Sequence, residues 1–317
     1  MTNSITIDCE LIQTQEAPKT TEEFKQLRDR ARIFCNGITN KYAKLLNFNS
    51  IKSLISDQEI ELNPSLENED LIIETTLHKY IDYCLEKTSL EANYYYDSTG
   101  VAGVKTYTDE PIYMISKNVC HDESLRKFVA CPEYLGDWFD KYFPYYRDLA
   151  VYGKRHTWFF IGPKNTKSEM HTDHDNIHTT IQQLDGVKRF FLLSPEDISF
   201  INKELPPNFF ASIEFKILDN GSCEVLDLSG ERDLSIMHEV NLLYGDLHPG
   251  DLVYLPANWG HYANSLKPSI SVSRDFIDER NADLYFTSIV LNGDVERLYM
   301  TITDKEIKRI ERKVLET

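Results

Sequence analysis

The sequence predicts a mainly β protein with helical additions (α+β), whose core is a jelly roll or barrel built from two sheets. Three observations support this fold class. Short runs of β-branched and aromatic residues follow one another through the second half of the chain, Gly, Pro and Asp separate these runs, and helical periodicity is confined to the two ends. The runs that we expect to form strands are 157–161, 177–184, 187–193, 251–255 and 269–276.

The N-terminal part, residues 1–110, is expected to be mostly helical and to pack on this core. Thr20 and Glu23 stand at capping-box spacing before an apolar stripe, so we predict an amphipathic helix over 20–36. A similar stripe predicts a helix over 71–87. Between these two segments, the Asn-, Ser- and Asp-rich stretch 47–70 predicts a loop.

The β core is expected to occupy residues 111–277, with an elaborated insertion at 197–246, and helices are expected over 278–317. Thr303 and Glu306 form a second capping box, and the apolar stripe behind it is narrow. Such a stripe packs on the core or pairs with a second copy of itself. We therefore expect the C-terminal helices to cover the barrel, with a homodimer through them as the alternative.

The amino-acid composition indicates which partners and which cellular compartment to expect. The 317 residues include 51 acidic and 34 basic side chains, a formal net charge of −17, and a field of that sign repels nucleic acid but suits a cationic peptide. No apolar run reaches the ~20 residues that span a bilayer. The first residues lack the basic and apolar regions of a secretory signal, and the six cysteines include no C-x-x-C pair. We expect a cytoplasmic protein with reduced thiols, no membrane contact and no nucleic-acid partner.

Two histidines and one aspartate form the candidate metal site. His171 and Asp173 lie two residues apart, a spacing at which both side chains of an extended strand point to the same face. His261 ends a segment in which Gly250 permits a turn and Pro256 ends a strand, so a neighbouring strand can deliver the second imidazole. Two imidazoles and one carboxylate leave three positions open on a ferrous ion, the arrangement with which non-haem iron activates dioxygen.

The other histidines are expected to serve structure. His174 and His178 are close enough in sequence to compete for the metal, but a strand would point the side chain of His174 away from that of Asp173. Isolated histidines are more often hydrogen-bonded core or surface residues than ligands. We expect this of the remaining ones, which are His78, His121, His156, His238 and His248.

Four motifs, in order along the chain, give it a resemblance to a known family. They are TWFFIGP at 157–163, SEMHTD at 168–173, QLDGVKRFFLLSP at 183–195 and PGDLVYLPANWGH at 249–261. Together they resemble the JmjC or cupin-like hydroxylases over about residues 110–276, and within that family the small hydroxylase branch typified by the asparaginyl hydroxylase of hypoxia-inducible factor. The resemblance implies a double-stranded β-helix that uses Fe(II), 2-oxoglutarate and O2.

The resemblance also implies which residues bind the cosubstrate. Relatives hold the distal carboxylate of 2-oxoglutarate with a lysine in a Gly-x-Lys-Arg motif, which this chain matches with Lys188. A buried dianion requires a fixed cation and hydroxyl donors, so the chemistry independently asks for such a residue. Tyr113 and Ser168 match the tyrosine and the Ser or Thr that relatives use beside this lysine. Ser273 stands where the family places a polar contact near the cosubstrate.

The predicted activity is hydroxylation of a protein or peptide side chain, coupled to oxidative decarboxylation of 2-oxoglutarate to succinate and CO2. An N-methyl target would lose formaldehyde, but the chain has no reader-like module that would favour such a demethylase. Two alternatives stay open: a free amino acid or other small molecule as the substrate, and a cupin fold that binds a ligand without turnover. The residues after Asp173 depart from the relatives, so their substrate recognition is not carried over.

Overall fold

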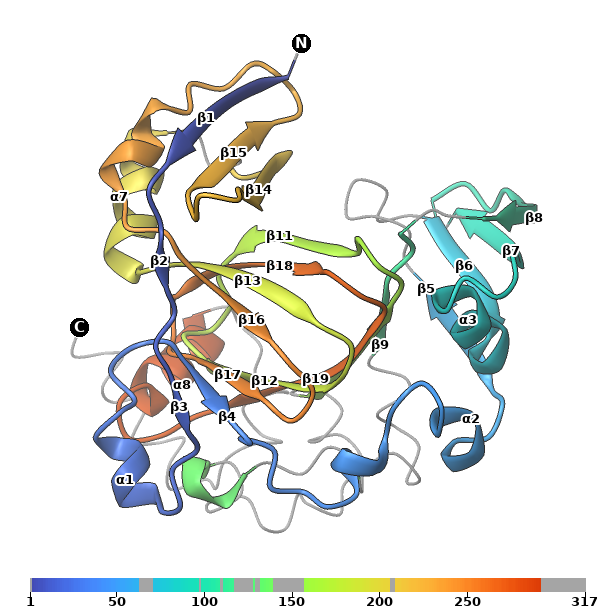
Figure 1. Ribbon diagram of the computed structural model, residues 1–317, viewed down its shortest axis with the longest axis horizontal. Helices are drawn as coiled ribbons and strands as arrows, with labels where there is room; N and C mark the ends of the chain where they lie inside the picture. The colour runs from blue at the N-terminus through green and yellow to red at the C-terminus, as the bar shows by residue number, and fades with distance from the viewer. Residues whose placement is uncertain are drawn as a thin grey trace.

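Two sheets face each other across the middle of the protein and form a double-stranded β-helix (Figure 1). The computed structural model describes residues 2–62, 71–96, 98–108, 111–116, 128, 132–138, 157–205 and 209–291. Within these residues the larger sheet has seven strands, in the order β3-β4-β17-β12-β19-β10-β9, and the smaller has five, in the order β11-β18-β13-β16-β2. The larger sheet comprises β3 (Thr14–Glu16), β4 (Arg32–Cys35), β17 (Leu252–Leu255), β12 (His178–Asp185), β19 (Ser269–Phe276), β10 (Thr157–Gly162) and β9 (Met114–Ser116). The smaller comprises β11 (Lys167–His171), β18 (Gly260–Ser265), β13 (Lys188–Leu193), β16 (Leu243–Leu247) and β2 (Glu10–Leu11).

The strands expected in the second half of the chain are all present. Each begins and ends within one residue of its prediction, as β10, β12, β13, β17 and β19. Apolar side chains from both sheets fill part of the space between them, among them Ile181, Phe190 and Val253. The prediction of a mainly β fold with helical additions is therefore confirmed.

A four-stranded sheet and a helix cover one side of the larger sheet. The sheet comprises β5 (Glu59–Leu62), β6 (Leu71–Thr76), β7 (Leu90–Tyr96) and β8 (Ala102–Tyr107), and α3 (Leu77–Cys84) packs beside it (Figure 1). Tyr80 of α3 is fully buried, and its hydroxyl accepts from the Met114 amide at 3.1 Å and donates to the Ile161 carbonyl oxygen at 2.7 Å. This hydrogen bonding fixes the strand β9 that follows Tyr113.

The expectation of a mostly helical N-terminal part is wrong. Helix α1 spans only Thr21–Lys25, although the Thr20 hydroxyl caps it as predicted, and the chain then forms the strand β4. Phe24 and Phe34 do share a core, with ring centroids 6.2 Å apart, because β4 folds back against α1. The helical spacing thus identified the correct apolar residues and the wrong local structure.

The segment predicted as a second helix is half strand. Its β-branched first half forms β6, and only its second half forms α3, where the predicted stripe is buried. The other short helices of the region are α2 (Ile51–Leu54) and the 3-10 turn η1 (Ala43–Leu45). The N-terminal part contributes the edge strands β2 and β3, and the strand β4 next to β3, to the two main sheets. The division of the chain at residues 110 and 277 stays a prediction.

Most of the predicted insertion forms a small module beside the smaller sheet, but its predicted end is wrong, because residues 243–246 belong to the core strand β16. The module contains most of α7 (Pro195–Glu204), the strands β14 (Ile213–Ile217) and β15 (Cys223–Asp227), and the 3-10 turn η6 (Ser235–Glu239). Strand β1 (Asn3–Ile7) pairs with β15 to complete a three-stranded sheet.

The C-terminal region begins with α8 (Ala282–Leu291). The helix predicted over 303–316, and with it the possible homodimer contact, lies outside the described residues. No helix in the described part of the chain is long and apolar enough to cross a membrane. Cys9, Cys35, Cys84 and Cys223 are free thiols.

Gly186 provides a test of the connection between β12 and β13. Its φ is +75°, and a Cβ built there lies 1.9 Å from the Pro268 carbonyl oxygen. We expect Gly186→Ala to lower the free energy of unfolding by more than about 2 kcal/mol. The substitution strains the backbone at a positive φ, and the new methyl group also displaces the Pro268 carbonyl. Gly221 has a φ of +86° with open space around it, so Gly221→Ala should cost about 1 kcal/mol. Urea denaturation measures both, and equal losses would contradict the close contact.

Candidate active site

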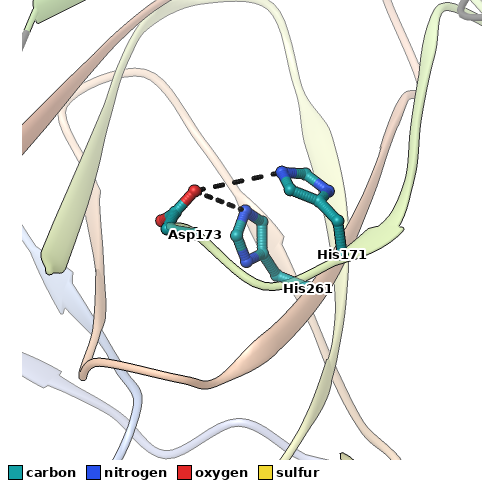
Figure 2. A group of neighbouring side chains, drawn as sticks. All are labelled: His171, Asp173 and His261. Carbon is teal, nitrogen blue, oxygen red and sulfur yellow. Dashed lines mark ion pairs between the residues drawn. The ribbon is translucent and has the colours of Figure 1, made fainter. Parts of the chain in front are cut away.

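Three side chains converge at one point between the sheets (Figure 2). Oδ1 of Asp173 lies 4.0 Å from Nε2 of His171 and 3.9 Å from Nε2 of His261. Among the described residues, this is the one group of His, Cys, Asp or Glu side chains with three possible ligand atoms within 4.8 Å of one another. Two atoms bound at about 2.1 Å to one ion are at most about 4.2 Å apart, so both Asp–His separations fit a single metal ion.

The pairing of β11 with β18 sets the two histidines side by side. Its register pairs His171 with His261, and the centroids of the two imidazoles are 4.2 Å apart. The prediction that Asp173 shares the strand is wrong, because β11 ends at His171 and Asp173 lies on the following loop. Thr179 of β12 holds it there by donating a hydrogen bond to Oδ2, which leaves Oδ1 as the oxygen nearest the histidines.

Both imidazoles present Nε2 to the aspartate. Nδ1 of His171 lies 2.7 Å from the Glu169 carbonyl oxygen, and Nδ1 of His261 lies 3.3 Å from that of Trp259. A carbonyl can only accept, so Nδ1 carries a proton in each ring, and the neutral form of each ring has its lone pair at Nε2, where a metal would bind. Desolvation and the neighbouring His261 lower the pKa of His171 to about 4. About half of the His171 side chain is accessible, 49%, but it faces a confined pocket.

A buried amine lies in the same pocket. Lys188 is 3% exposed, and its Nζ donates to the Tyr113 hydroxyl and the Ser271 hydroxyl, both at 2.6 Å. The aromatic rings of Tyr113 and Phe160 lie 5.1 and 5.2 Å from the same nitrogen. Burial lowers the pKa of Lys188 to about 7. Because its two hydrogen-bond partners are neutral hydroxyls, an anion that entered this pocket would stabilise the charged amine.

Two of the residues predicted to bind a cosubstrate, Tyr113 and Ser168, lie near this lysine together with Ser271. Tyr113 is hydrogen-bonded to Ser168 as well as to Lys188. Ser273 lines the pocket, but the serine that contacts Lys188 is Ser271, two residues earlier on β19. Ser271 and Ser273, two residues apart on one strand, lie on the same face of it. Ser271 was missed because only the placement of the strand against Lys188 distinguishes one serine from the next.

All the predicted site residues line one pocket of about 860 Å³. Its wall also includes the aromatic residues Trp158 and Phe160 and the carboxylates of Glu169, Asp175 and Asp275.

Sequence analysis missed two polar residues beside the candidate ligands. The Thr179 hydroxyl, which holds Asp173, also lies 3.1 Å from Oδ1 of Asp275. Alternation along β12 gives Thr179 the interior face. Nothing in the sequence pairs it with an aspartate on the preceding loop.

The remaining histidines lie outside the cluster. His174 is exposed at the pocket wall, and His178 is buried with hydrogen bonds to the Ala257 amide and to Asp278. His78, His238 and His248 are not among the residues that line the pocket. His121 and His156 lie outside the described residues.

Comparison with known proteins identifies related chains. Residues 74–279 match the cupin-like domain family. The chain is 21% identical over 260 residues to the 2-oxoglutarate and iron-dependent oxygenase JMJD4 homolog of Drosophila melanogaster, covering 80% of this chain and 56% of that protein. It is 34% identical over 116 residues to the lysine-specific demethylase JMJ30 of Arabidopsis thaliana, covering 37% and 24% of the two chains. It is also 30% identical over 114 residues to Jumonji C domain-containing protein 5 of Drosophila melanogaster, covering 36% and 26%. The matches thus span about half or less of the length of these relatives.

The burial of Lys188 predicts how the free energy of unfolding depends on pH. In the unfolded chain Lys188 has its ordinary pKa of about 10.4. In the folded protein that pKa is about 7, so below pH 7 the folded state bears the full desolvation cost of the charge. As the pH rises from 7 towards 10 this cost disappears.

We therefore expect Lys188→Met to stabilise the ligand-free protein relative to wild type most at or below pH 7, and progressively less at higher pH. Denaturant titrations at several pH values measure this difference. The exposed Lys267 provides the control, Lys267→Met, and a Lys188→Met difference that does not change with pH would contradict the assignment.

Proposed function

This chain belongs to the cupin-like domain family, and we propose that it is an Fe(II)- and 2-oxoglutarate-dependent dioxygenase that hydroxylates a protein or peptide side chain. The family match confirms the resemblance to JmjC and cupin-like proteins that the motifs predicted. One observation carries the proposal: the His171, Asp173 and His261 donors and the buried amine of Lys188 line the same pocket.

The donor set supports iron as the metal. Two neutral imidazoles and one carboxylate are the protein ligands of the non-haem Fe(II) oxygenases, and they leave positions for a chelating cosubstrate and for O2. His171 and His261 each keep the Nε2 lone pair for the metal, and Asp173 offers Oδ1 while Thr179 holds Oδ2. A relative over 80% of the chain is named as a 2-oxoglutarate and iron-dependent oxygenase.

The surroundings of Lys188 support 2-oxoglutarate as the cosubstrate. A dicarboxylate needs a cation at the end that does not chelate the metal, together with hydroxyl donors for its second oxygen. Lys188 would supply the cation, and Tyr113, Ser168 and Ser271 the hydroxyl groups. The positive charge would then have an anionic partner in a pocket where it otherwise has neutral ones.

The bound iron and cosubstrate would supply the oxidation, in which 2-oxoglutarate, O2 and a substrate C–H bond give succinate, CO2 and an alcohol. The side chains of the protein would bind the metal and the cosubstrate and keep water out of the pocket. The two imidazoles and the restrained carboxylate would hold the metal ion, and the aromatic rings of Trp158 and Phe160 in the pocket wall would help to keep water away from a bound cosubstrate. Lys188 must be protonated to hold the carboxylate.

The pocket's acidic wall supports a substrate segment that carries basic groups. Glu169, Asp175 and Asp275 line the pocket, and the chain has a net charge of −17. A peptide side chain with a positive charge would be attracted to this field. The same oxidation at an N-methyl carbon would release formaldehyde, so hydroxylation and demethylation differ only in the carbon that is presented.

Substitution of Lys188 tests the proposed binding of 2-oxoglutarate quantitatively. Lys188→Ala should raise the 2-oxoglutarate concentration needed for half-maximal turnover at least about tenfold, because a charge-assisted contact is lost, and should change the Fe(II) requirement little. Initial rates of succinate formation at varied 2-oxoglutarate and varied Fe(II) measure both quantities. Equal changes in the two requirements would count against the assigned role.

The activity itself is tested by mass spectrometry of products. We expect wild-type protein with Fe(II), 2-oxoglutarate and O2 to form succinate, a basic peptide mixture to stimulate this, and a peptide to gain one oxygen atom. Asp173→Ala should do none of these. Stimulation by free amino acids alone would favour a small-molecule hydroxylase, and folded wild-type protein that forms no succinate under any condition would favour a non-catalytic cupin.

A further inference from the structure

The loop that carries Asp173 and the turn that leads to His261 are tied together outside the pocket. The loop, residues 172–177, connects β11 to β12, and the turn, residues 256–259, connects β17 to β18. Behind both lies the segment 278–288, which contains the beginning of α8. Two side chains, those of Asn176 and His178, connect all three.

His178 joins the turn to the C-terminal segment. The Ala257 amide donates to Nδ1 of His178 at 2.9 Å, so this nitrogen has no proton and Nε2 carries one. Nε2 faces Oδ1 of Asp278 at 3.4 Å, and the two residues are 3% and 1% exposed. Desolvation alone would raise the pKa of Asp278, but hydrogen bonds from His178 and Arg280 lower it overall. Asp278 therefore stays charged and accepts these hydrogen bonds. Burial lowers the pKa of His178, which favours the neutral ring that can accept from Ala257.

Asn176 joins the loop to the same two partners. Its Oδ1 accepts from Nδ2 of Asn258 at 3.0 Å, and its Nδ2 donates to the Ser288 hydroxyl at 2.9 Å. Its backbone carbonyl accepts from Nδ2 of Asn281 at 2.8 Å. The φ of Asn176 is +53°, a left-handed conformation that asparagine tolerates better than most residues. The loop is thus held by side-chain contacts at its far end from the metal cluster.

These contacts matter because the three candidate ligands are not equally fixed. The ladder between β11 and β18 sets the two histidines opposite each other, whereas Asp173 stands on a loop without ladder hydrogen bonds. The position of Asp173 therefore depends on where its loop is anchored. The turn before His261 depends on the same anchor through Ala257 and Asn258.

We propose that His178 and Asn176 are positioning residues of the metal centre, which hold the Asp173 loop and the His261 turn against each other with the C-terminal segment 278–288 as their support. This inference rests on the proposed function, because it takes the His171, Asp173 and His261 cluster to be a metal site. It makes the C-terminal segment part of the centre without any contact to the metal.

Two substitutions of one residue separate positioning from general stability. His178→Asn places an amide oxygen near the position of Nδ1, so it can still accept from Ala257 while it loses Asp278. His178→Gln reaches towards Asp278 in place of Nε2, but it offers Ala257 no acceptor at the position of Nδ1. The contact with the turn is thus kept in one variant and removed in the other. The exposed His238 provides the control, His238→Gln.

The measurement is a titration of each metal-free protein with Co(II), followed by visible absorption, with far-UV circular dichroism and thermal unfolding in parallel. We expect His178→Gln to weaken Co(II) binding about tenfold or more, the size typical of changes behind metal ligands. His178→Asn should bind Co(II) more tightly than His178→Gln, and His238→Gln should match wild type. Asn176→Gly, which permits the positive φ but removes both side-chain contacts, should weaken binding as His178→Gln does.

The outcomes are distinguishable. Wild-type binding in His178→Gln and Asn176→Gly, or weakening in both His178 variants that merely follows the loss of thermal stability, would overturn the positioning role and leave the proposed function standing. Folded wild-type protein that does not bind Co(II) would overturn both. Weakening in His178→Gln that His178→Asn rescues would support the inference.

Discussion

The antiparallel pairing of β11 with β18 is the contact on which the candidate centre depends. It sets His171 opposite His261, and in each ring Nδ1–H donates to a backbone carbonyl two residues upstream, so Nε2 of each faces the centre as a candidate ligand atom. Asp173 has no such support and relies on a hydrogen bond from Thr179 and on the anchoring of its loop. Regular structure fixes the imidazoles, and side-chain contacts fix the carboxylate.

The rest of the pocket is distinguished by its charged side chains. A carboxylate and two imidazoles form a candidate site for a metal ion, and a buried amine with hydroxyl partners forms a candidate site for an anion. A molecule that chelates the metal and carries a second carboxylate satisfies both requirements at once. Further acidic side chains line the same pocket, so it contains both a buried amine and several carboxylates.

The sequence predicted some strands and most of the candidate site residues, but not the N-terminal structure or the contacts between separate strands. Five strands of the second half, β10, β12, β13, β17 and β19, were predicted to within one residue because each is a distinct β-branched and aromatic run bounded by turns. The ordered motifs also singled out residues that line one pocket. The helix over 20–36 failed because helical spacing of apolar residues does not distinguish a helix from a helix and a strand that pack together. The contributions of Ser271 and Thr179 depend on contacts between separate strands and loops, which spacing along a chain does not encode.

The central claim is that the His171, Asp173 and His261 cluster and Lys188 together form one oxygenase site. The most direct test is an anaerobic titration of the metal-free protein with Fe(II) and 2-oxoglutarate, followed by visible absorption, with His171→Ala as the control. We expect wild-type protein to show a charge-transfer band of the chelated oxoacid that His171→Ala lacks. Well-folded wild-type protein without this band would contradict the claim.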